Sequence, residues 1–210
     1  MKFFKYSILI EFIIFQIIWS QSYPPPTNLV TVPSAGTLVR GSFAMQMRVQ
    51  KNGGLTTSLR AGLTDRFQFG LSYGSANLIG DDSLIWYPKP EASLKYRLID
   101  ETESFPGMSI GIDTQGHGQF HSADSLMRYD IKAMGMYIST SKNWVTPLGN
   151  LGLHLGSNYN FAEINDGDKD INYFLGLDIE FNPELSFILE YNAALNENNM
   201  TAKTIAINRG

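Results

Sequence analysis

Eight charged side chains fall at alternate positions in short stretches whose other members on the same side are mostly small or polar. The cations come early in the chain and the anions come later. If these stretches lie side by side, the charges either form an ion-pair network that fills a narrow interior or line a charged channel. We favour the network, because buried charges need partners of opposite sign. The eight residues are Arg48, Arg60, Lys95, Arg97, Asp113, Asp178, Glu180 and Glu190.

Two further clusters contain side chains that bind metals. In 165–170, "NDGDKD", three aspartates have the spacing of a calcium loop, but the Gly and Glu that such a loop needs at its sixth and twelfth positions are missing. His117 and His121, with Asp113 and Asp124 nearby, have the chemistry to bind a divalent cation. Both histidines lie in a stretch rich in Gly and Ser. We interpret both clusters as polar loops and predict no metal site.

A catalytic site needs a nucleophile or a general base that other polar groups hold in place. His154 shares one side of a predicted strand with Asn158 and Asn160, and no Ser nucleophile is recognisable beside it. We interpret His154 as a histidine that is hydrogen-bonded inside the protein. The sequence therefore predicts no enzyme, no catalytic residue and no cofactor.

The elements that carry these residues are β-strands. In 151–161, "LGLHLGSNYNF", the leucines face one side and the glycines face the other, together with His154. An alternation of period two is typical of strands. It predicts nine strands, at 43–50, 55–63, 67–74, 92–98, 108–113, 134–139, 151–161, 172–181 and 185–192. Shorter and longer connections alternate between most of them, which is typical of an up-and-down antiparallel sheet.

Two architectures give such an alternation. In a soluble sandwich or lipocalin-like barrel the apolar side faces inward, whereas in a transmembrane barrel it faces lipid. Here the polar sides are rich in Gly, Ser and Asn, and charged residues are 17 % of the chain, below the roughly 25 % of a soluble domain. With 201–207 as a weaker tenth strand, the sequence predicts an all-β, up-and-down antiparallel transmembrane β-barrel of about ten strands.

Aromatic residues near the ends of the predicted strands agree with this fold. A spanning sheet has to close on itself, because hydrocarbon offers no hydrogen-bond partner, and aromatic belts mark its two interfaces with water. The candidates for these belts are Tyr73, Trp86, Trp144, Tyr159, Phe161, Tyr173, Phe181 and Tyr191.

The N-terminus has the features of an export signal. Lys2 and Lys5 precede an apolar run over 8–19, and a cleavage site of the small-x-small form follows at 20–22. The alternative is an uncleaved anchor helix, for which the run is short. The predicted division is a signal peptide at 1–22, a periplasmic extended segment at 23–38 and an outer-membrane β-barrel at 39–210.

Composition excludes some functions. The formal net charge of −4 gives no electrostatic reason to expect nucleic-acid binding. Cysteine is absent, which excludes disulfides and thiolate metal sites.

Five stretches have the strand and turn motifs of a known group: "PSAGTLVRGSF" (33–43), "AGLTDRFQFGLSYGSANLIG" (61–80), "PKPEASLKYRLIDE" (88–101), "SIGIDTQGHG" (109–118) and "NPELSFILEYNAALNEN" (182–198). Together they resemble the barrel region of the YjbH-like outer-membrane proteins, which are associated with exopolysaccharide production, and related uncharacterised barrels of Gram-negative bacteria. The resemblance implies an outer-membrane location and a link to polysaccharide secretion. It implies no catalytic residues.

One feature departs from bacterial outer-membrane barrels, which commonly end in a strand with a terminal aromatic residue. This sequence ends in "TAKTIAINRG". Either the last strand is atypical, or the chain is truncated relative to a longer barrel.

The sequence thus predicts a monomer that is embedded in outer-membrane lipid and assists envelope polysaccharide export, with a polysaccharide or an export complex as its partner. The alternatives are a passive pore for small solutes and a structural or adhesion barrel that acts through its long loops. The substrate stays open at this point.

Overall fold

A computed structural model of the chain describes residues 26–80, 82–122, 126–182 and 184–197. It is an all-β structure with a ten-stranded antiparallel sheet and a separate two-stranded sheet. All nine predicted strands are present, so the predicted all-β fold and the up-and-down antiparallel order are confirmed. The large sheet contains β1 (Phe43–Val49), β2 (Leu55–Thr64), β3 (Phe67–Ala76), β4 (Ile85–Trp86), β5 (Glu91–Ile99), β6 (Gly107–Asp113), β9 (Gly135–Thr146), β10 (Gly149–Tyr159), β11 (Asn172–Asn182) and β12 (Leu185–Asn192).

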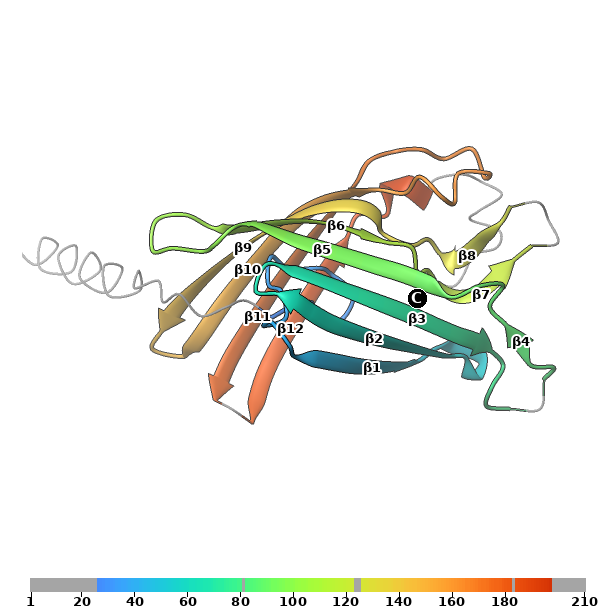
Figure 1. Cartoon of the computed structure of the whole chain (residues 1–210), viewed down its shortest axis with the longest axis horizontal. Coiled ribbons are helices and arrows are strands. Elements are labelled where there is room, and N and C mark those ends of the chain that lie inside the picture. Colours follow the sequence, from blue (N-terminus) through green and yellow to red (C-terminus); the bar gives the residue numbers. More distant parts are fainter. Residues whose placement is uncertain (1–25, 81, 123–125, 183, 198–210) are drawn as a thin grey trace, which may run out of the picture.

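The strands of the large sheet follow one another in chain order, β1-β2-β3-β5-β6-β9-β10-β11-β12. The short β4 pairs with the end of β3 and is the tenth strand. Residues 201–207, the predicted tenth strand, lie outside the described residues. Figure 1 shows that the sheet is strongly curved. In the described part of the chain, β1 and β12 are not paired with each other, so no closed barrel is formed there.

The sheet has two different ends. β2–β3, β9–β10 and β11–β12 are joined by tight turns, and β5–β6 by a somewhat longer one; this is the short-turn end. The opposite, long-loop end carries the connection with β4 and the one with β7 (His117–His121) and β8 (Arg128–Ile131), which pair with each other. It also carries the 3-10 helices η1 (Lys51–Gly53) and η2 (Leu195–Glu197).

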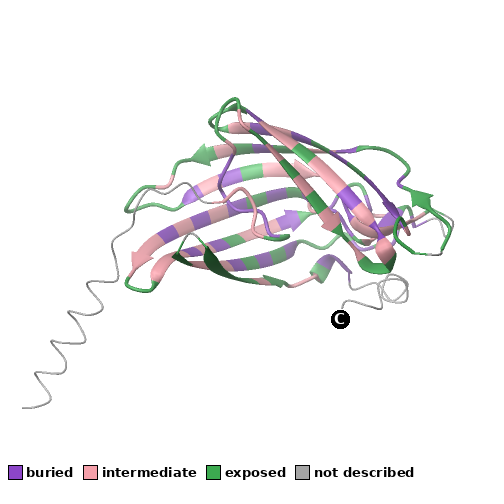
Figure 2. Ribbon diagram, turned by 90° about the horizontal axis from the view of Figure 1, so that it is seen from below, coloured by how far each residue is buried: buried purple, intermediate pink, exposed green. Residues whose placement is uncertain are grey.

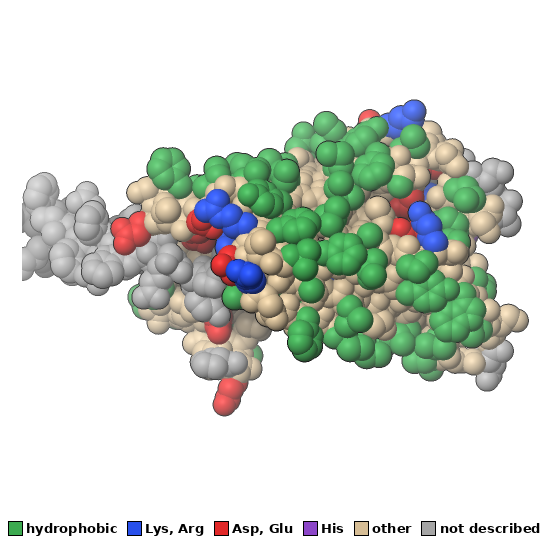
Figure 3. All heavy atoms as spheres, in the orientation of Figure 1, with side chains coloured by type: hydrophobic (Ala, Val, Ile, Leu, Met, Phe, Trp, Pro, Cys, Tyr) green, Lys and Arg blue, Asp and Glu red, His purple; other side chains and the backbone are tan. Residues whose placement is uncertain are grey.

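The polarity of the sheet is the reverse of that of a water-soluble protein. Phe43 in β1 is 83 % exposed, and exposed Leu94 and Tyr96 flank Lys95 in β5, which is 2 % exposed. Buried and exposed residues therefore alternate as bands along the strands (Figure 2). Hydrophobic side chains cover the strands on the face shown in Figure 3, with charged side chains toward its two ends. The polar and small side chains point to the concave side.

The apolar core is correspondingly small. It consists of Val32, Tyr137 and Phe174, with Met134 packed against them. Most other fully buried side chains are polar, and they include Ser, Lys, Arg, Asn and His. Among the described residues, no helix is long and apolar enough to cross a bilayer.

Candidate functional site

Residues 27–38, here called the inner segment, lie on the concave side of the sheet. Val32, Ser34 and Ala35 are completely buried, and Figure 1 shows this segment in blue among the strands. It belongs to 23–38, which the sequence assigns to a periplasmic extended segment. The alternation of the strands gives no indication that this segment enters the interior.

Lys95 anchors the inner segment at mid-strand. Its Nζ donates to the Ser34 and Gly36 carbonyl oxygens at 3.1 and 3.2 Å, to Asn28 Oδ1 at 3.3 Å and to the Thr27 carbonyl. Four neutral oxygens thus replace the water of a buried ammonium group, as burial of a charge requires. The ion-pair partner that the sequence predicts for Lys95 is replaced by the backbone of the inner segment.

A row of serines holds the next part of the inner segment. Ser109 and Ser139 Oγ both donate to the Ser34 carbonyl, at 3.2 and 2.9 Å. The Ala35 amide donates to Ser141 Oγ at 2.8 Å. Ser109, Ser139 and Ser141 are at most 1 % exposed, so these hydroxyls are shielded from solvent beneath the segment.

Ser141 also contacts His154, in a chain of hydrogen bonds that the sequence does not reveal. Ser141 lies opposite His154 in the pairing of β9 and β10. Its Oγ is 2.7 Å from His154 Nδ1, and His154 Nε2 is 2.6 Å from Asp178 Oδ1. Cross-strand pairing, which needs the register, is the only signal that would have identified Ser141.

This Ser-His-Asp chain supports the inner segment. The Ser141 hydroxyl accepts a hydrogen bond from the Ala35 amide and shares a second one with His154 Nδ1. His154 is completely buried, and a substrate carbonyl has no access to Ser141 Oγ while the segment is in place.

Glu190 and Arg48 bind the start of the inner segment from the two edges of the sheet. Glu190 in β12 accepts from the amides of Val30 and Val32 at 2.8 and 2.9 Å. It also accepts from the amide and the hydroxyl of Thr31, the latter at 2.6 Å. Arg48 in β1 donates from Nη2 to the Val30 carbonyl at 2.6 Å. Residues 30–32 therefore connect strands that do not pair with each other.

Close packing also requires glycine beneath the segment. A Cβ atom on Gly62 would stand 2.8 Å from the backbone carbonyl oxygen of Leu38, closer than Cβ atoms approach a backbone oxygen. Gly62 thus makes room for the end of the inner segment.

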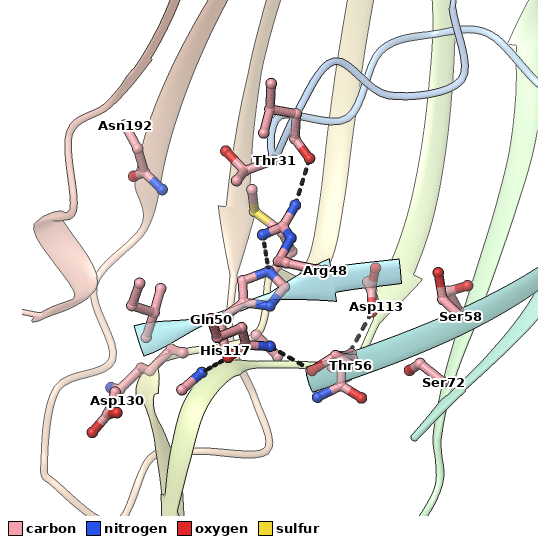
Figure 4. A pocket seen from close by; sticks show the side chains of 18 of the residues that line it. Thr31, Arg48, Gln50, Thr56, Ser58, Ser72, Asp113, His117, Asp130 and Asn192 are labelled. Atoms are coloured by element: carbon pink, nitrogen blue, oxygen red, sulfur yellow. Dashed lines mark hydrogen bonds between the residues drawn. The ribbon is translucent and has the colours of Figure 1, made fainter. Parts of the chain in front are cut away.

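A cavity of about 740 Å³ occupies the long-loop half of the interior. Amide, hydroxyl and charged side chains line most of it, and Asn28, Val30 and Thr31 of the inner segment form part of its wall. Figure 4 shows Arg48 between Thr31 and His117 in this cavity, with Asp113 to the right of them. A smaller cavity of about 310 Å³ lies toward the short-turn end and is also lined by Asn28. The inner segment therefore takes part in the walls of both cavities.

His117 forms the wall of the large cavity next to Arg48. Arg48 Nη1 lies 3.0 Å from His117 Nε2, and guanidinium groups only donate. Nε2 is therefore the acceptor. Burial first, and the charge of Arg48 second, lower the pKa of His117 to about 3, so the ring is neutral at physiological pH and carries its proton on Nδ1.

A compact cluster of charged side chains lies at the long-loop end. Asp166 lies 2.7 Å from both Arg128 Nη1 and Lys132 Nζ. Burial raises the pKa of Asp166, but hydrogen bonds from Lys132, the Asp168 amide and Arg128 outweigh it and lower that pKa. The aspartate of "NDGDKD" therefore binds cationic side chains of the protein itself.

Glu163 joins this cluster to the backbone. It accepts from the amides of Tyr129 and Ala133 at 2.7 and 2.6 Å. Burial raises its pKa more than these hydrogen bonds lower it. The connection between β10 and β11 is thus attached to β8.

The remaining members of the predicted charge set lie in separate places. Arg60 donates to Gln46 Oε1 at 3.1 Å, and Asp113 accepts from the Gln115 amide at 3.0 Å, both in the large cavity. Arg97 pairs with Asp100 at 2.9 Å near the short-turn end. Glu180 accepts from Asn150 at 3.4 Å. The eight residues line the concave side, but the hydrogen bonds and ion pairs described here do not join them into one network.

The histidines of the candidate metal cluster point to protein partners. His117 contacts Arg48, and His121 Nε2 lies 2.5 Å from Asp130 Oδ1. Asp124 lies outside the described residues. In the part of the chain that the structure describes, no group of three or more His, Asp or Glu side chains is arranged to hold a metal ion.

Comparison with protein-family models, curated proteins and solved structures gives no match for this chain. The resemblance to the YjbH-like proteins therefore stays a prediction from the sequence motifs.

Proposed function

We propose that this chain is an outer-membrane β-barrel protein with a polar interior that is closed by its own inner segment. The observation that carries the proposal is the reversed polarity: large apolar side chains on the convex face and polar side chains on the concave face. Water-soluble sheets bury the apolar side, whereas a membrane barrel exposes it to lipid.

The aromatic residues support the same proposal. Tyr159, Tyr173 and Tyr191 lie at the long-loop ends of their strands and are exposed. Tyr73 stacks on Trp86 at that end, with ring centroids 5.8 Å apart. Phe181 and Trp144 lie near the short-turn ends of their strands. Two aromatic belts would place both ends of the sheet at membrane interfaces.

Within this location, we propose assistance in envelope polysaccharide export as the biological role. The large cavity offers amide and hydroxyl groups that both donate and accept, which suits a hydroxyl-rich ligand. The inner segment argues against the alternative of a permanently open pore, because it fills the interior between the two cavities. A structural or adhesion role has no specific observation in its favour.

The membrane location is tested with tryptophan fluorescence. Once residues 1–22 are removed, Trp86 and Trp144 are the two tryptophans left. The mature chain is refolded with phosphatidylcholine vesicles that carry bromine at different depths of their acyl chains. We expect quenching of both tryptophans, strongest for shallow bromine, with Trp86→Phe and Trp144→Phe to separate the two signals. Unquenched fluorescence from protein that stays in the aqueous phase would contradict the proposal.

The export role is tested by deletion of the gene in its host and measurement of secreted polysaccharide. We expect a decrease that the wild-type gene restores. This role alone would be contradicted if the deletion left the amount of secreted polysaccharide unchanged and the wild-type parent strain carried the protein in its outer membrane.

A further inference from the structure

Arg48 is a cavity-lining cation that makes no ion pair with any described residue. Its two hydrogen bonds go to uncharged acceptors, the Val30 carbonyl and His117 Nε2. Arginine in a partly dehydrated site is normally matched by a carboxylate or phosphate, because its planar fork fits two oxygens.

The two acidic side chains whose charges act on Arg48, Glu190 and Asp113, form hydrogen bonds with other groups. The carboxylate of Glu190 accepts from three backbone amides and the Thr31 hydroxyl. Asp113 Oδ1 accepts from the Gln115 amide. Neither makes an ion pair with the Arg48 guanidinium, although both influence it across the cavity.

His117 provides a second donor beside Arg48. Because Nε2 accepts from Arg48, the proton lies on Nδ1, and this nitrogen is buried without a hydrogen-bond partner among the described residues. An unsatisfied buried donor is costly. Nδ1 has almost no accessible surface, so a ligand oxygen would reach it once the imidazole, which Figure 4 shows within the cavity, turns toward the ligand.

We propose that the large cavity binds an acidic ligand, with a carboxylate or phosphate group on Arg48 and a neighbouring ligand oxygen accepting from His117 Nδ1. The volume of about 740 Å³ admits a small molecule or one unit of a polymer. This inference rests on the proposed function in one respect, which is that the large cavity is where a ligand binds. It adds the chemical class of that ligand.

The test is calorimetric binding to the refolded mature chain in detergent micelles. The probes are galacturonate, glucose 6-phosphate and, as the neutral match, galactose. We expect binding of at least one acidic sugar and much weaker binding of galactose. Arg48→Gln should weaken the acidic sugar about ten- to hundredfold, as expected for a charged hydrogen-bonded contact. Arg66→Gln, at the short-turn end, is the matched control and should bind as the wild type does.

The two acidic probes separate the possible sources of the ligand. Preference for galacturonate indicates a carboxylate, and preference for glucose 6-phosphate indicates a phosphate ester. Equal binding of galactose and the acidic sugars, or unchanged binding in Arg48→Gln, would overturn the inference.

Arg48→Lys keeps the positive charge and loses the fork, so it should bind with intermediate affinity even if the Gln variant does not fold. Insertion into vesicles is measured on the same samples. Normal insertion without acidic-sugar binding by the wild type rejects this site alone, whereas failed insertion rejects the membrane location.

Discussion

The two halves of the interior provide different hydrogen-bond partners for their inward-facing polar side chains. Toward the short-turn end, the inward side chains of Lys95, Ser139 and Ser141 bind the backbone of the inner segment. Toward the long-loop end, Arg48 binds the Val30 carbonyl at the edge of the segment and also contacts His117. Arg60 contacts Gln46, and these side chains surround an open cavity. Both halves use the same strands and the same alternation of residues.

The difference teaches that a polar strand face does not by itself specify a channel. A face of small polar residues accepts either water or a peptide backbone, since both present donors and acceptors. In the short-turn half the backbone of 27–38 takes that place. In the long-loop half the segment forms only part of the cavity wall, and the remaining space is available to a ligand.

The largest expected effect comes from removal of the Lys95 ammonium. Lys95→Met leaves the four oxygens around Nζ without their donor, and we expect a loss of about 3 kcal/mol in the free energy of unfolding. Freed of its anchor, the inner segment should also leave the interior. Thermal unfolding in micelles and single-channel recording in planar bilayers measure the two effects.

The control for this variant is Lys89→Met, because Lys89 is an exposed lysine that is paired only with Glu91. It should remain close to wild-type stability and conductance. Steady conductance steps in the wild type would instead favour the passive pore, because they would show that the inner segment does not block the interior.

Glu190→Gln should have the next largest effect. The amide keeps the shape of the side chain but loses the charge that strengthens its bonds to residues 30–32, at a cost of about 2 kcal/mol. The start of the inner segment should become accessible to protease. Glu180→Gln is the matched control, since Glu180 accepts one long bond from Asn150; equal protease sensitivity in both variants would show that Glu190 does not hold the segment.

The cavity half should respond to acid through His117. Its pKa is about 3 in the folded chain and about 6.5 when unfolded, so the unfolded state binds the extra proton between these values. Stability should therefore fall as the pH drops through this window, by up to about 2 kcal/mol between pH 7 and pH 5. His117→Gln should flatten this dependence in unfolding experiments at several pH values, and an unchanged slope would contradict a neutral buried His117.

We expect the smallest effect on stability from the exposed ion pairs at the short-turn end, outside both halves of the interior. Arg66 and Arg97 share Asp100 there, and Arg66 and Asp100 are about half exposed. Arg66→Gln should change the free energy of unfolding by less than about 1 kcal/mol, measured by denaturant unfolding. A larger loss would mean that these ion pairs contribute as much as the interior does.

Strand positions were predictable because the period-two pattern is local. Residues such as Leu94 and Lys95 reveal their opposite faces by being neighbours in the chain, and this holds for all nine predicted strands. The same pattern identified Arg48 and Arg60 as inward-facing. It did not show which partners they would meet, because partners depend on register and on segments far away in the chain.

The sequence by itself determined the all-β fold, the order of the strands and the side of the sheet that is polar, since adjacent side chains in a strand point in opposite directions. Only the tertiary structure decided that residues 27–38 lie inside the curved sheet, that Ser141 meets His154 and that Asp166 binds Arg128 and Lys132. These contacts join residues 13 to more than 100 positions apart. Their formation depends on the curvature of the whole sheet, which no local pattern encodes.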